Sequence, residues 1–299
     1  MNELYKKQVA LLIRIMPSVY TIKGFAVHGG TAINLFHKDM PRYSVDIDIT
    51  YIPVKAREES LKEINAHLIS LKQMIEKTIP GIKVTHKPDV WKLLCMKDGA
   101  SVKIEVNGTK RGIIGTVEDK TLCTKAQSEF NMGCIARTVS FTQLYGGKIS
   151  AALSRQHPRD LFDCKYMPLD SLEQAKEGLL FCLLGSDKPI IESLQPNPID
   201  QREALENQFL GMTDIPFTYE DYENTRKQLI TSVNATLTDE DKAFLISFEK
   251  GEPQWDNSGY SHFKDFPSIQ WKLLNISKLK TQNPAKHKQE VEKLKAFFG

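Results

Sequence analysis

The stretch that decides the fold begins at Gly29-Gly30-Thr31-Ala32 and ends at Asp46-Ile47-Asp48. Between residues 44 and 51 polar and apolar residues alternate, which is typical of a β-strand with one buried face. In such a strand Asp46 and Asp48 point to the same side, and the apolar residues between them point into a core. The two carboxylates are therefore predicted to leave the sheet together.

Two carboxylates on one strand face repel each other, and a divalent cation relieves that repulsion. Mg²⁺ usually takes one or two protein carboxylates and completes its octahedron with phosphate oxygens. The glycine pair precedes an apolar helical segment, Thr31–Phe36, and backbone N–H groups at a helix start favour phosphate. Together these features predict a metal–triphosphate site. Each alone has a plainer interpretation, because a single Asp-x-Asp is often a solvated strand edge and Gly-Gly is often a turn.

Arg42 lies in the loop between the glycine pair and the aspartates. It is predicted either to hold a phosphate or the aspartates, or to be an ordinary exposed loop arginine.

A second strand with clear alternation runs from residue 102 to residue 107. Lys103 and Glu105 share one of its faces. If this strand lies beside the strand of Asp46 and Asp48, Glu105 is a third carboxylate, serving as a metal ligand or as a base for an attacking hydroxyl. The alternative is a solvent-facing glutamate paired with Lys103.

Charged residues also recur on two successive helices predicted after residue 141. Lys148 and Arg155 are seven residues apart, hence on one helix face. Asp160 and Asp163 are three residues apart on the next helix. These side chains suit the phosphates and ribose of a nucleotide. The alternative is a surface ion-pair network between adjacent helices.

Composition bounds the class of protein. The 299 residues are 41% hydrophobic and 26% charged, which is typical of a soluble globular protein. No apolar run reaches membrane-spanning length, so no membrane partner is predicted. Five cysteines without Cys-x-x-Cys spacing favour a reducing, cytoplasmic setting over a zinc site or a disulfide framework. A formal net charge of +3 permits a nucleic-acid partner without requiring one.

Four motifs, in order, resemble those of the AbiEii/AbiGii toxin family of nucleotidyltransferases. The first is Gly29–Leu35 followed by Arg42–Asp48, and the second is Lys103–Val106, with Glu105 where the family often has aspartate. The third, Lys148–Arg155, is a Lys-x-x-Ala-x-x-x-Arg-like helix, and the fourth is Arg159–Asp163. The tail near residues 251–276 is similar too, so the resemblance covers nearly the whole chain.

The resemblance implies an α/β fold of α+β type with a mixed sheet: a polymerase-β-like nucleotidyltransferase domain followed by a mostly helical domain. The expected bounds are 1–138 for the nucleotidyltransferase core and 139–299 for the helical domain. The helical domain is expected to complete the nucleotide site and to contact the acceptor. Hydrophobic periodicity agrees in predicting one amphipathic helix over residues 57–79 and a mostly helical chain after residue 141.

Carried over residue by residue, the resemblance implies that Asp46, Asp48 and Glu105 bind Mg²⁺ (or Mn²⁺). Lys148 would hold the triphosphate of an NTP substrate with help from Arg155. Asp160 or Asp163 would complete the catalytic group. The nucleotide-binding residues that the resemblance implies are Gly29, Gly30, Thr31, Arg42, Ser44, Lys103, Lys148 and Arg155.

The family also implies a biological role, as the toxin of a prokaryotic toxin–antitoxin or abortive-infection system. Characterised relatives transfer nucleotides to an RNA acceptor, the 3′ end of tRNA, which stops aminoacylation and translation. An antitoxin would be a separate protein. Two alternatives stay open from the residues: a nucleotidyltransferase acting on a protein or a small molecule, and a non-catalytic nucleotide-binding interaction protein.

Overall fold

A computed structural model describes residues 2–168 and 171–299. The chain forms two compact units. Unit 1 consists of the residues up to Ser140 together with Leu205–Phe217, and unit 2 consists of Phe141–Ala204 and Thr218–Gly299. The first passage between units thus lies close to residue 138, whereas residues 205–217, expected in the helical domain, belong to unit 1.

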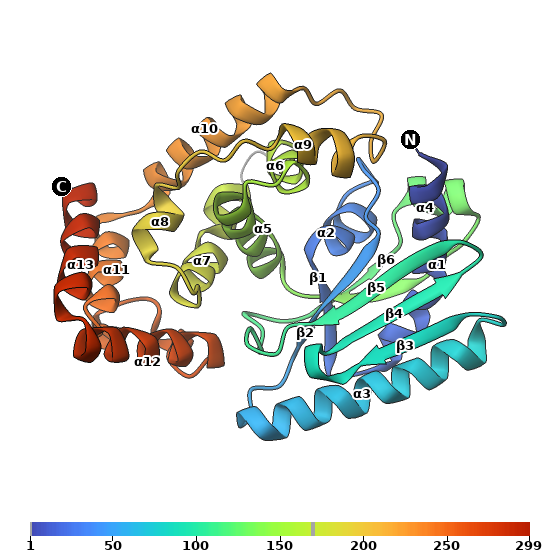
Figure 1. Cartoon of the computed structure of the whole chain (residues 1–299), viewed down its shortest axis with the longest axis horizontal. Helices are drawn as coiled ribbons and strands as arrows, with labels where there is room; N and C mark the ends of the chain where they lie inside the picture. Colours follow the sequence, from blue (N-terminus) through green and yellow to red (C-terminus); the bar gives the residue numbers. More distant parts are fainter. Residues whose placement is uncertain (1, 169–170) are drawn as a thin grey trace. The chain divides into compact units, whose positions relative to one another are not determined.

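Unit 1 is built on a mixed sheet in which the described strands have the order β3-β4-β5-β2-β1-β7-β6 (Figure 1). β2 pairs antiparallel with β1 and parallel with β5, so it lies in the middle of the sheet. The strands are β1 (Phe25–His28), β2 (Asp46–Tyr51), β3 (Lys83–Lys87), β4 (Lys92–Lys97), β5 (Ala100–Val106), β6 (Glu118–Thr121) and β7 (Ile135–Thr138).

Two long helices, α1 (Glu3–Thr21) and α3 (Arg57–Thr78), lie side by side and cover the sheet. The predicted stripe of α3 is buried at Ile64, Leu68, Leu71 and Ile75, and each such side chain contributes about 1.5–3 kcal/mol by leaving water. Acidic residues in its first turn and Lys77 in its last complement the helix dipole. Short helices complete unit 1: α2 (Gly29–Thr31), the π-helical turn η1 (Ala32–His37), η2 (Pro88–Val90), α4 (Thr124–Phe130) and η3 (Leu205–Phe209).

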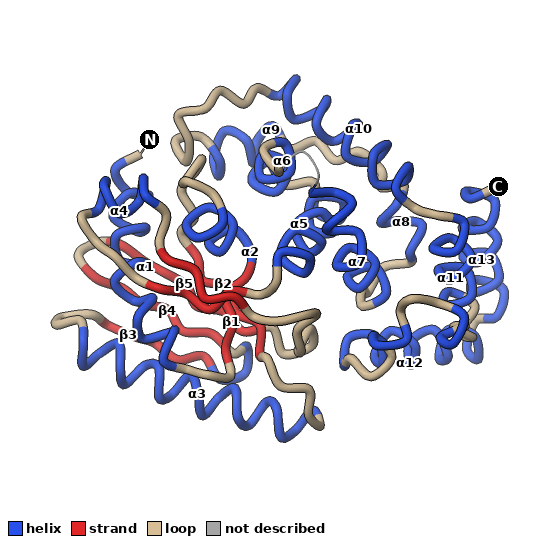
Figure 2. Tube along the Cα trace, turned by 180° about the vertical axis from the view of Figure 1, so that it is seen from behind, coloured by secondary structure: helices blue, strands red, loops and turns tan. Residues whose placement is uncertain are grey.

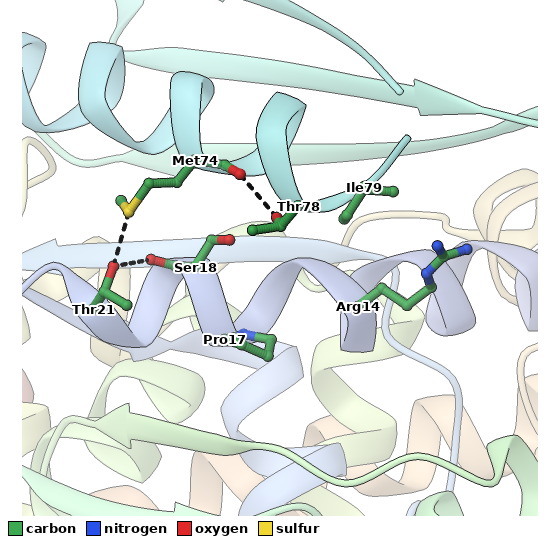
Figure 3. A pocket seen from close by; sticks show the side chains of 7 residues that line it. All are labelled: Arg14, Pro17, Ser18, Thr21, Met74, Thr78 and Ile79. Carbon is green, nitrogen blue, oxygen red and sulfur yellow. Dashed lines mark hydrogen bonds between the residues drawn. The ribbon is translucent and has the colours of Figure 1, made fainter. Parts of the chain in front are cut away.

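A hollow of about 390 Å³ lies between α1 and α3 (Figure 3). Its hydroxyl groups bond within or between the two helices: Thr21 donates to the Ser18 carbonyl (2.7 Å) and to Met74 Sδ (3.3 Å), and Thr78 donates to the Met74 carbonyl (2.8 Å). The hollow therefore offers mainly apolar surface, on the helix-covered side of the sheet.

Residues 205–217 are held in unit 1 by backbone hydrogen bonds. The N–H of Tyr43 donates to the Met212 carbonyl (2.7 Å), and the N–H of Asn2 donates to the Gly211 carbonyl (2.8 Å). The Thr213 hydroxyl donates to the Pro41 carbonyl (2.8 Å). The segment thus anchors the loop that leads into β2.

Unit 2 is helical in its described residues (Figure 2). α5 and α7 pack backbone to backbone, because a Cβ on Gly146 would lie 2.3 Å from the Leu179 nitrogen and one on Gly178 would lie 2.0 Å from the Thr142 carbonyl oxygen. Capping boxes begin α10 at Thr218 and α11 at Thr238. Its main helices are α5 (Phe141–Arg155), α6 (Pro158–Lys165), α7 (Ser171–Leu184), α8 (Ile190–Leu194), α10 (Tyr219–Thr236), α11 (Asp239–Glu249), α12 (Pro267–Gln282) and α13 (Pro284–Phe298), with the single turn α9 (Arg202–Ala204) and the 3₁₀ turns η4 (Trp255–Asn257) and η5 (Ser261–Phe263). In the described residues no helix combines the length and the apolar character needed to cross a membrane.

Candidate functional site

The two aspartates of β2 lie on one face of the sheet, as the alternation predicts. The apolar residues between and after them are buried on the α3 side, where Tyr51 donates a hydrogen bond to Glu63 of α3. Asp46 and Asp48 are half-buried on the opposite face. Antiparallel pairing with β1 sets His28 opposite Asp48. The carboxylates therefore stand at the end of β1, where the glycine pair begins.

Gly29 and Gly30 are needed because charged side chains approach them closely. Gly29 has φ +70°, a conformation that glycine adopts without steric cost. A Cβ on Gly29 would lie 2.6 Å from Asp48 Oδ2. A Cβ on Gly30 would lie 2.8 Å from Arg42 Nη2 and 2.9 Å from Ser44 Oγ. The turn is thus packed directly against a carboxylate, a guanidinium and a hydroxyl.

Thr31 and Ser44 lie beneath the glycine turn and are buried. Thr31 Oγ1 is 3.0 Å from Ser44 Oγ, and the Thr31 hydroxyl donates to the carbonyl of Asp46. The side-chain amide of Asn34 donates to the Gly30 carbonyl (2.9 Å). These bonds fix the turn relative to β2. A direct role of Thr31 and Ser44 in nucleotide binding stays a prediction.

Arg42 is only 2% exposed, so its interpretation as an exposed loop arginine is wrong. Its Nη1 donates to the Tyr43 carbonyl (2.8 Å), and its Nη2 lies against Gly30. A buried guanidinium is costly unless polar or anionic groups surround it. Its position beside the glycine turn suits a phosphate ligand.

The β5 strand lies beside β2, and this predicted adjacency is confirmed. In the parallel register Asp46 pairs with Lys103 and Asp48 pairs with Glu105. Paired residues of neighbouring strands point to the same face. Glu105 is therefore a third carboxylate on the face that bears the two aspartates.

Glu105 is also held by two lysines. Its Oε1 lies 3.0 Å from the ammonium of Lys92 and its Oε2 lies 3.1 Å from that of Lys103. Burial raises the pKa of Glu105, but the hydrogen bonds and charges of the two lysines outweigh it and hold that pKa below its ordinary value. Burial lowers the pKa of Lys103, but the charges of Asp46, Glu105 and Asp48 raise it overall. Glu105 therefore lies beside Asp48 and is paired with Lys103, as the alternative interpretation has it; its role as a metal ligand or base stays a prediction.

In unit 2, Lys148 forms a buried ion-pair cluster with both aspartates of α6. Its ammonium lies 2.8 Å from Asp160 Oδ1 and 2.9 Å from Asp163 Oδ2, and all three side chains are at most 6% exposed. Arg155, which is 65% exposed, reaches Asp160 Oδ2 at 2.8 Å. His157 caps α6 by accepting from the Arg159 N–H (3.1 Å). The predicted ion-pair network between the two helices thus exists, but its core of Lys148, Asp160 and Asp163 is buried and does not lie on the surface.

A family model described as nucleotidyl transferase AbiEii toxin, type IV toxin–antitoxin system, matches residues 11–274. The chain belongs to the AbiEii nucleotidyltransferase toxin family. The matched residues include the β2 aspartates, Glu105 and the Lys148 cluster. This AbiEii chain is accordingly a nucleotidyltransferase and a toxin of the toxin–antitoxin class.

A search of solved structures finds the same fold in MenT4, a nucleotidyltransferase toxin from Mycobacterium tuberculosis H37Rv. The TM-score is 0.62 at 10% sequence identity, covering 92% of this chain and 95% of that chain. The expected fold class is thereby confirmed. A search of curated proteins finds no match.

The residues of this AbiEii chain fit a hard divalent cation. Asp46 and Asp48 supply two carboxylates on one face, and the carboxylate of Asp48 lies against the Gly29 backbone, where a Cβ would displace it. Within residues 2–168 and 171–299, no three His, Cys, Asp or Glu side chains are grouped so that they could hold a metal ion, Asp46, Asp48 and Glu105 included. Two carboxylates with phosphate oxygens are the usual Mg²⁺ arrangement in enzymes that use nucleoside triphosphates.

Lys92, which contacts Glu105, is not marked by any pattern in the sequence. Its partner, Glu105, is found only through the antiparallel register of β4 and β5. The run Lys92-Leu93-Leu94 breaks the polar–apolar alternation, so nothing in the local pattern marked this lysine.

Proposed function

We propose that the protein transfers a nucleoside monophosphate from an NTP to an RNA acceptor, the 3′ end of tRNA, in a Mg²⁺-dependent reaction that blocks translation. The observation that carries the proposal is the approach of Asp48 to Gly29 at the end of β1. A carboxylate and a glycine turn in direct contact provide a cation ligand and a phosphate cradle together.

In this proposal Asp46 and Asp48 hold Mg²⁺ (or Mn²⁺), and Glu105 joins them as third ligand. When bound, the ion would screen the charge of the triphosphate and of the leaving pyrophosphate. Glu105 is about one third exposed, so its ion pairs with Lys92 and Lys103 contribute at most about 1 kcal/mol each. These lysines can therefore exchange the carboxylate for phosphate oxygens of the substrate.

The triphosphate is bound, in the same proposal, by Gly29, Gly30, Thr31, Arg42 and Ser44 of unit 1, with Lys103. For Lys148 and Arg155 of unit 2, the resemblance of their motif to that of the family supports a role in nucleotide binding. Asp160 and Asp163 position the ammonium of Lys148, and Asp160 also orients Arg155.

The chemical step is an in-line displacement. The acceptor hydroxyl attacks the α-phosphorus of the NTP, a new O–P bond forms, the bond to the β-phosphate oxygen breaks, and pyrophosphate leaves. The hydroxyl proton goes to a neighbouring carboxylate, for which Glu105 is the candidate if it is not engaged as a ligand. Fixed positive charge around the transferring group is the main contribution of the protein.

Label transfer tests the proposal. The purified protein is incubated with each α-labelled NTP, Mg²⁺ and total tRNA, beside Asp48→Asn and a matched control, Asp98→Asn, in the exposed β4–β5 turn. We expect labelled tRNA from wild type and Asp98→Asn, and a loss of at least about 100-fold from Asp48→Asn. If no RNA is labelled, or if Asp48→Asn equals wild type, the proposal is wrong. Label in protein or in a small molecule would identify another acceptor.

Glu105→Gln in the same assay distinguishes a metal ligand from a glutamate with a purely structural role. A third metal ligand predicts a lower apparent Mg²⁺ affinity that added Mg²⁺ or Mn²⁺ partly restores. A purely structural glutamate predicts a metal titration identical to that of wild type.

The toxin role is tested in cells. Induced expression should arrest growth, and Asp48→Asn should relieve the arrest at equal protein level. The acceptor tRNAs recovered from arrested cells should carry extra nucleotides at their 3′ ends and resist aminoacylation.

A further inference from the structure

One face of the sheet beyond β2 carries lysines in register with the catalytic aspartates. On the α3 side of β3, β4 and β5 most side chains are buried, as at Val84, Cys95 and Ile104. On the opposite face none of the side chains is buried: Lys83, Thr85 and Lys87 of β3, Lys92, Leu94 and Met96 of β4, and Ser101, Lys103 and Glu105 of β5. We name this second set the basic face.

The strand register places one row of the basic face in line with Asp48. Lys87 pairs with Lys92, Lys92 pairs with Glu105, and Glu105 pairs with Asp48. Neighbouring strands are about 4.8 Å apart, so Lys87 lies roughly three strand spacings, or about 14 Å, from Asp48. The row thus leads away from the reacting centre across three strands.

The outer end of this row places two lysines side by side. Lys87 and Lys92 are direct cross-strand partners, and like charges directly opposite each other are destabilising. Among the described residues, neither Lys83 nor Lys87 forms an ion pair, whereas Lys92 pairs with Glu105, and Lys103 pairs with Glu105 and also lies beside Asp46. Asp89 in the β3–β4 turn is the nearest acidic residue in sequence. The face therefore carries excess positive charge that an external polyanion would neutralise.

The geometry points to the basic face as the binding surface for the sugar–phosphate backbone of the RNA acceptor. This inference rests on the proposed function. A repeating phosphate charge suits a row of lysines spaced by strands, and lysines bind phosphates as point charges without reading the base. Met96, 47% exposed, adds apolar surface between the lysines. At about 14 Å from Asp48, Lys87 reaches phosphates that lie a few nucleotides from the reacting 3′ end.

The test compares Lys83→Gln/Lys87→Gln with a matched control, Lys62→Gln/Lys77→Gln, on α3. Both double variants lose two positive charges from unit 1, but only the first loses them from the basic face. Binding of a single-stranded RNA of about ten nucleotides is measured across a salt series. We expect the slope of log K against log salt to fall by about 1.4 in the first variant and to stay unchanged in the second.

Transfer kinetics supply a second measurement. The first variant should show a several-fold higher KM for the longer RNA and an unchanged rate with a dinucleotide acceptor, which is too short to reach Lys87. A wild-type salt slope in Lys83→Gln/Lys87→Gln would overturn the inference, while RNA labelling by wild type would leave the proposed function standing. Loss of binding to an acidic protein partner, with RNA binding intact, would also overturn it. If wild type labels no RNA, the proposed function fails first and the inference fails with it.

Discussion

At Gly29 two separate demands coincide in one residue. Its φ of +70° disfavours any side chain, and the carboxylate of Asp48 occupies the space of a Cβ. Gly99, in the β4–β5 turn, has a similar φ of +78° but no atom within 4 Å of the Cβ position. The two glycines therefore allow the effect of backbone strain to be separated from the effect of displacing the Asp48 carboxylate.

Gly29→Ala and Gly99→Ala should both lower the free energy of unfolding by about 1–2 kcal/mol, the cost of left-handed backbone with a side chain. Only Gly29→Ala should also abolish nucleotidyl transfer, because its methyl group must push Asp48 aside. Chemical denaturation and label transfer measure the two effects. Equal activity in the two variants would show that Asp48 is not held at the reacting position.

His37, at the end of η1, is a second residue with a measurable consequence. Burial and then the charge of Lys120 lower its pKa from 6.5 to about 4, against a weaker opposing effect of Glu118. Its Nε2 lies 3.0 Å from the Thr138 hydroxyl. The folded protein therefore holds this imidazole neutral at pH values where the unfolded chain protonates it.

Because the folded-state pKa is the lower one, the stability that neutral His37 allows is complete above about pH 6.5 and declines as the pH falls toward about 4. The slope from this group is at most about 1.4 kcal/mol per pH unit. His37→Gln should lose less stability than wild type between about pH 7 and about pH 5. Denaturant melts at the two pH values measure the difference, and parallel losses would contradict the assignment.

At the scale of elements, α5 and α6 are joined by the buried cluster of Lys148, Asp160 and Asp163. Removing one partner from a buried ion pair leaves an uncompensated charge, which is strongly destabilising. Arg155 contacts the same cluster from solvent, where an ion pair contributes little. The buried residues of the cluster are therefore expected to stabilise unit 2, whereas the exposed Arg155 is expected to bind the nucleotide.

Asp163→Asn should destabilise unit 2 by about 3–5 kcal/mol. Arg155→Gln should change stability by at most about 1 kcal/mol but raise the KM for NTP. Denaturation and steady-state kinetics measure these effects. An Asp163→Asn protein as stable as wild type would contradict the structural role of Asp163. An Arg155→Gln enzyme with an unchanged KM for NTP would contradict a role of Arg155 in nucleotide binding.

At the scale of the whole molecule, the chain enters unit 2 after Ser140, returns to unit 1 at Leu205, and leaves it again after Phe217. The returning segment is anchored at Tyr43, close to β2 and its aspartates. Met212 is 2% exposed and Leu210 is 73% exposed. Unit 1 therefore depends on residues that follow α5 and α6 of unit 2 in the sequence.

Met212→Ala should cost about 2–5 kcal/mol through loss of buried contacts, and Leu210→Ala should cost almost nothing. Hydrogen exchange in the full chain should rise around residues 41–51 in Met212→Ala, with no change in α10 of unit 2. Equal exchange at the two regions would show that the segment does not belong to unit 1 in solution.

The sequence by itself determined which faces of the elements are buried and where most of the long elements lie. The alternation around Asp46, Asp48 and Glu105 and the stripe of α3 follow from local periods of two and 3.6 residues. The order of the four motifs was sufficient to indicate the family and to predict its fold.

Only the tertiary structure decided which side chains are neighbours. Lys92 reaches Glu105 through strand register, Asp160 and Asp163 enclose Lys148 through helix packing, Arg42 is buried, and residues 205–217 return to unit 1. A periodic pattern specifies the direction of a side chain but not the partner that it meets. That partner is set by pairing between segments far apart in sequence, which no local pattern contains.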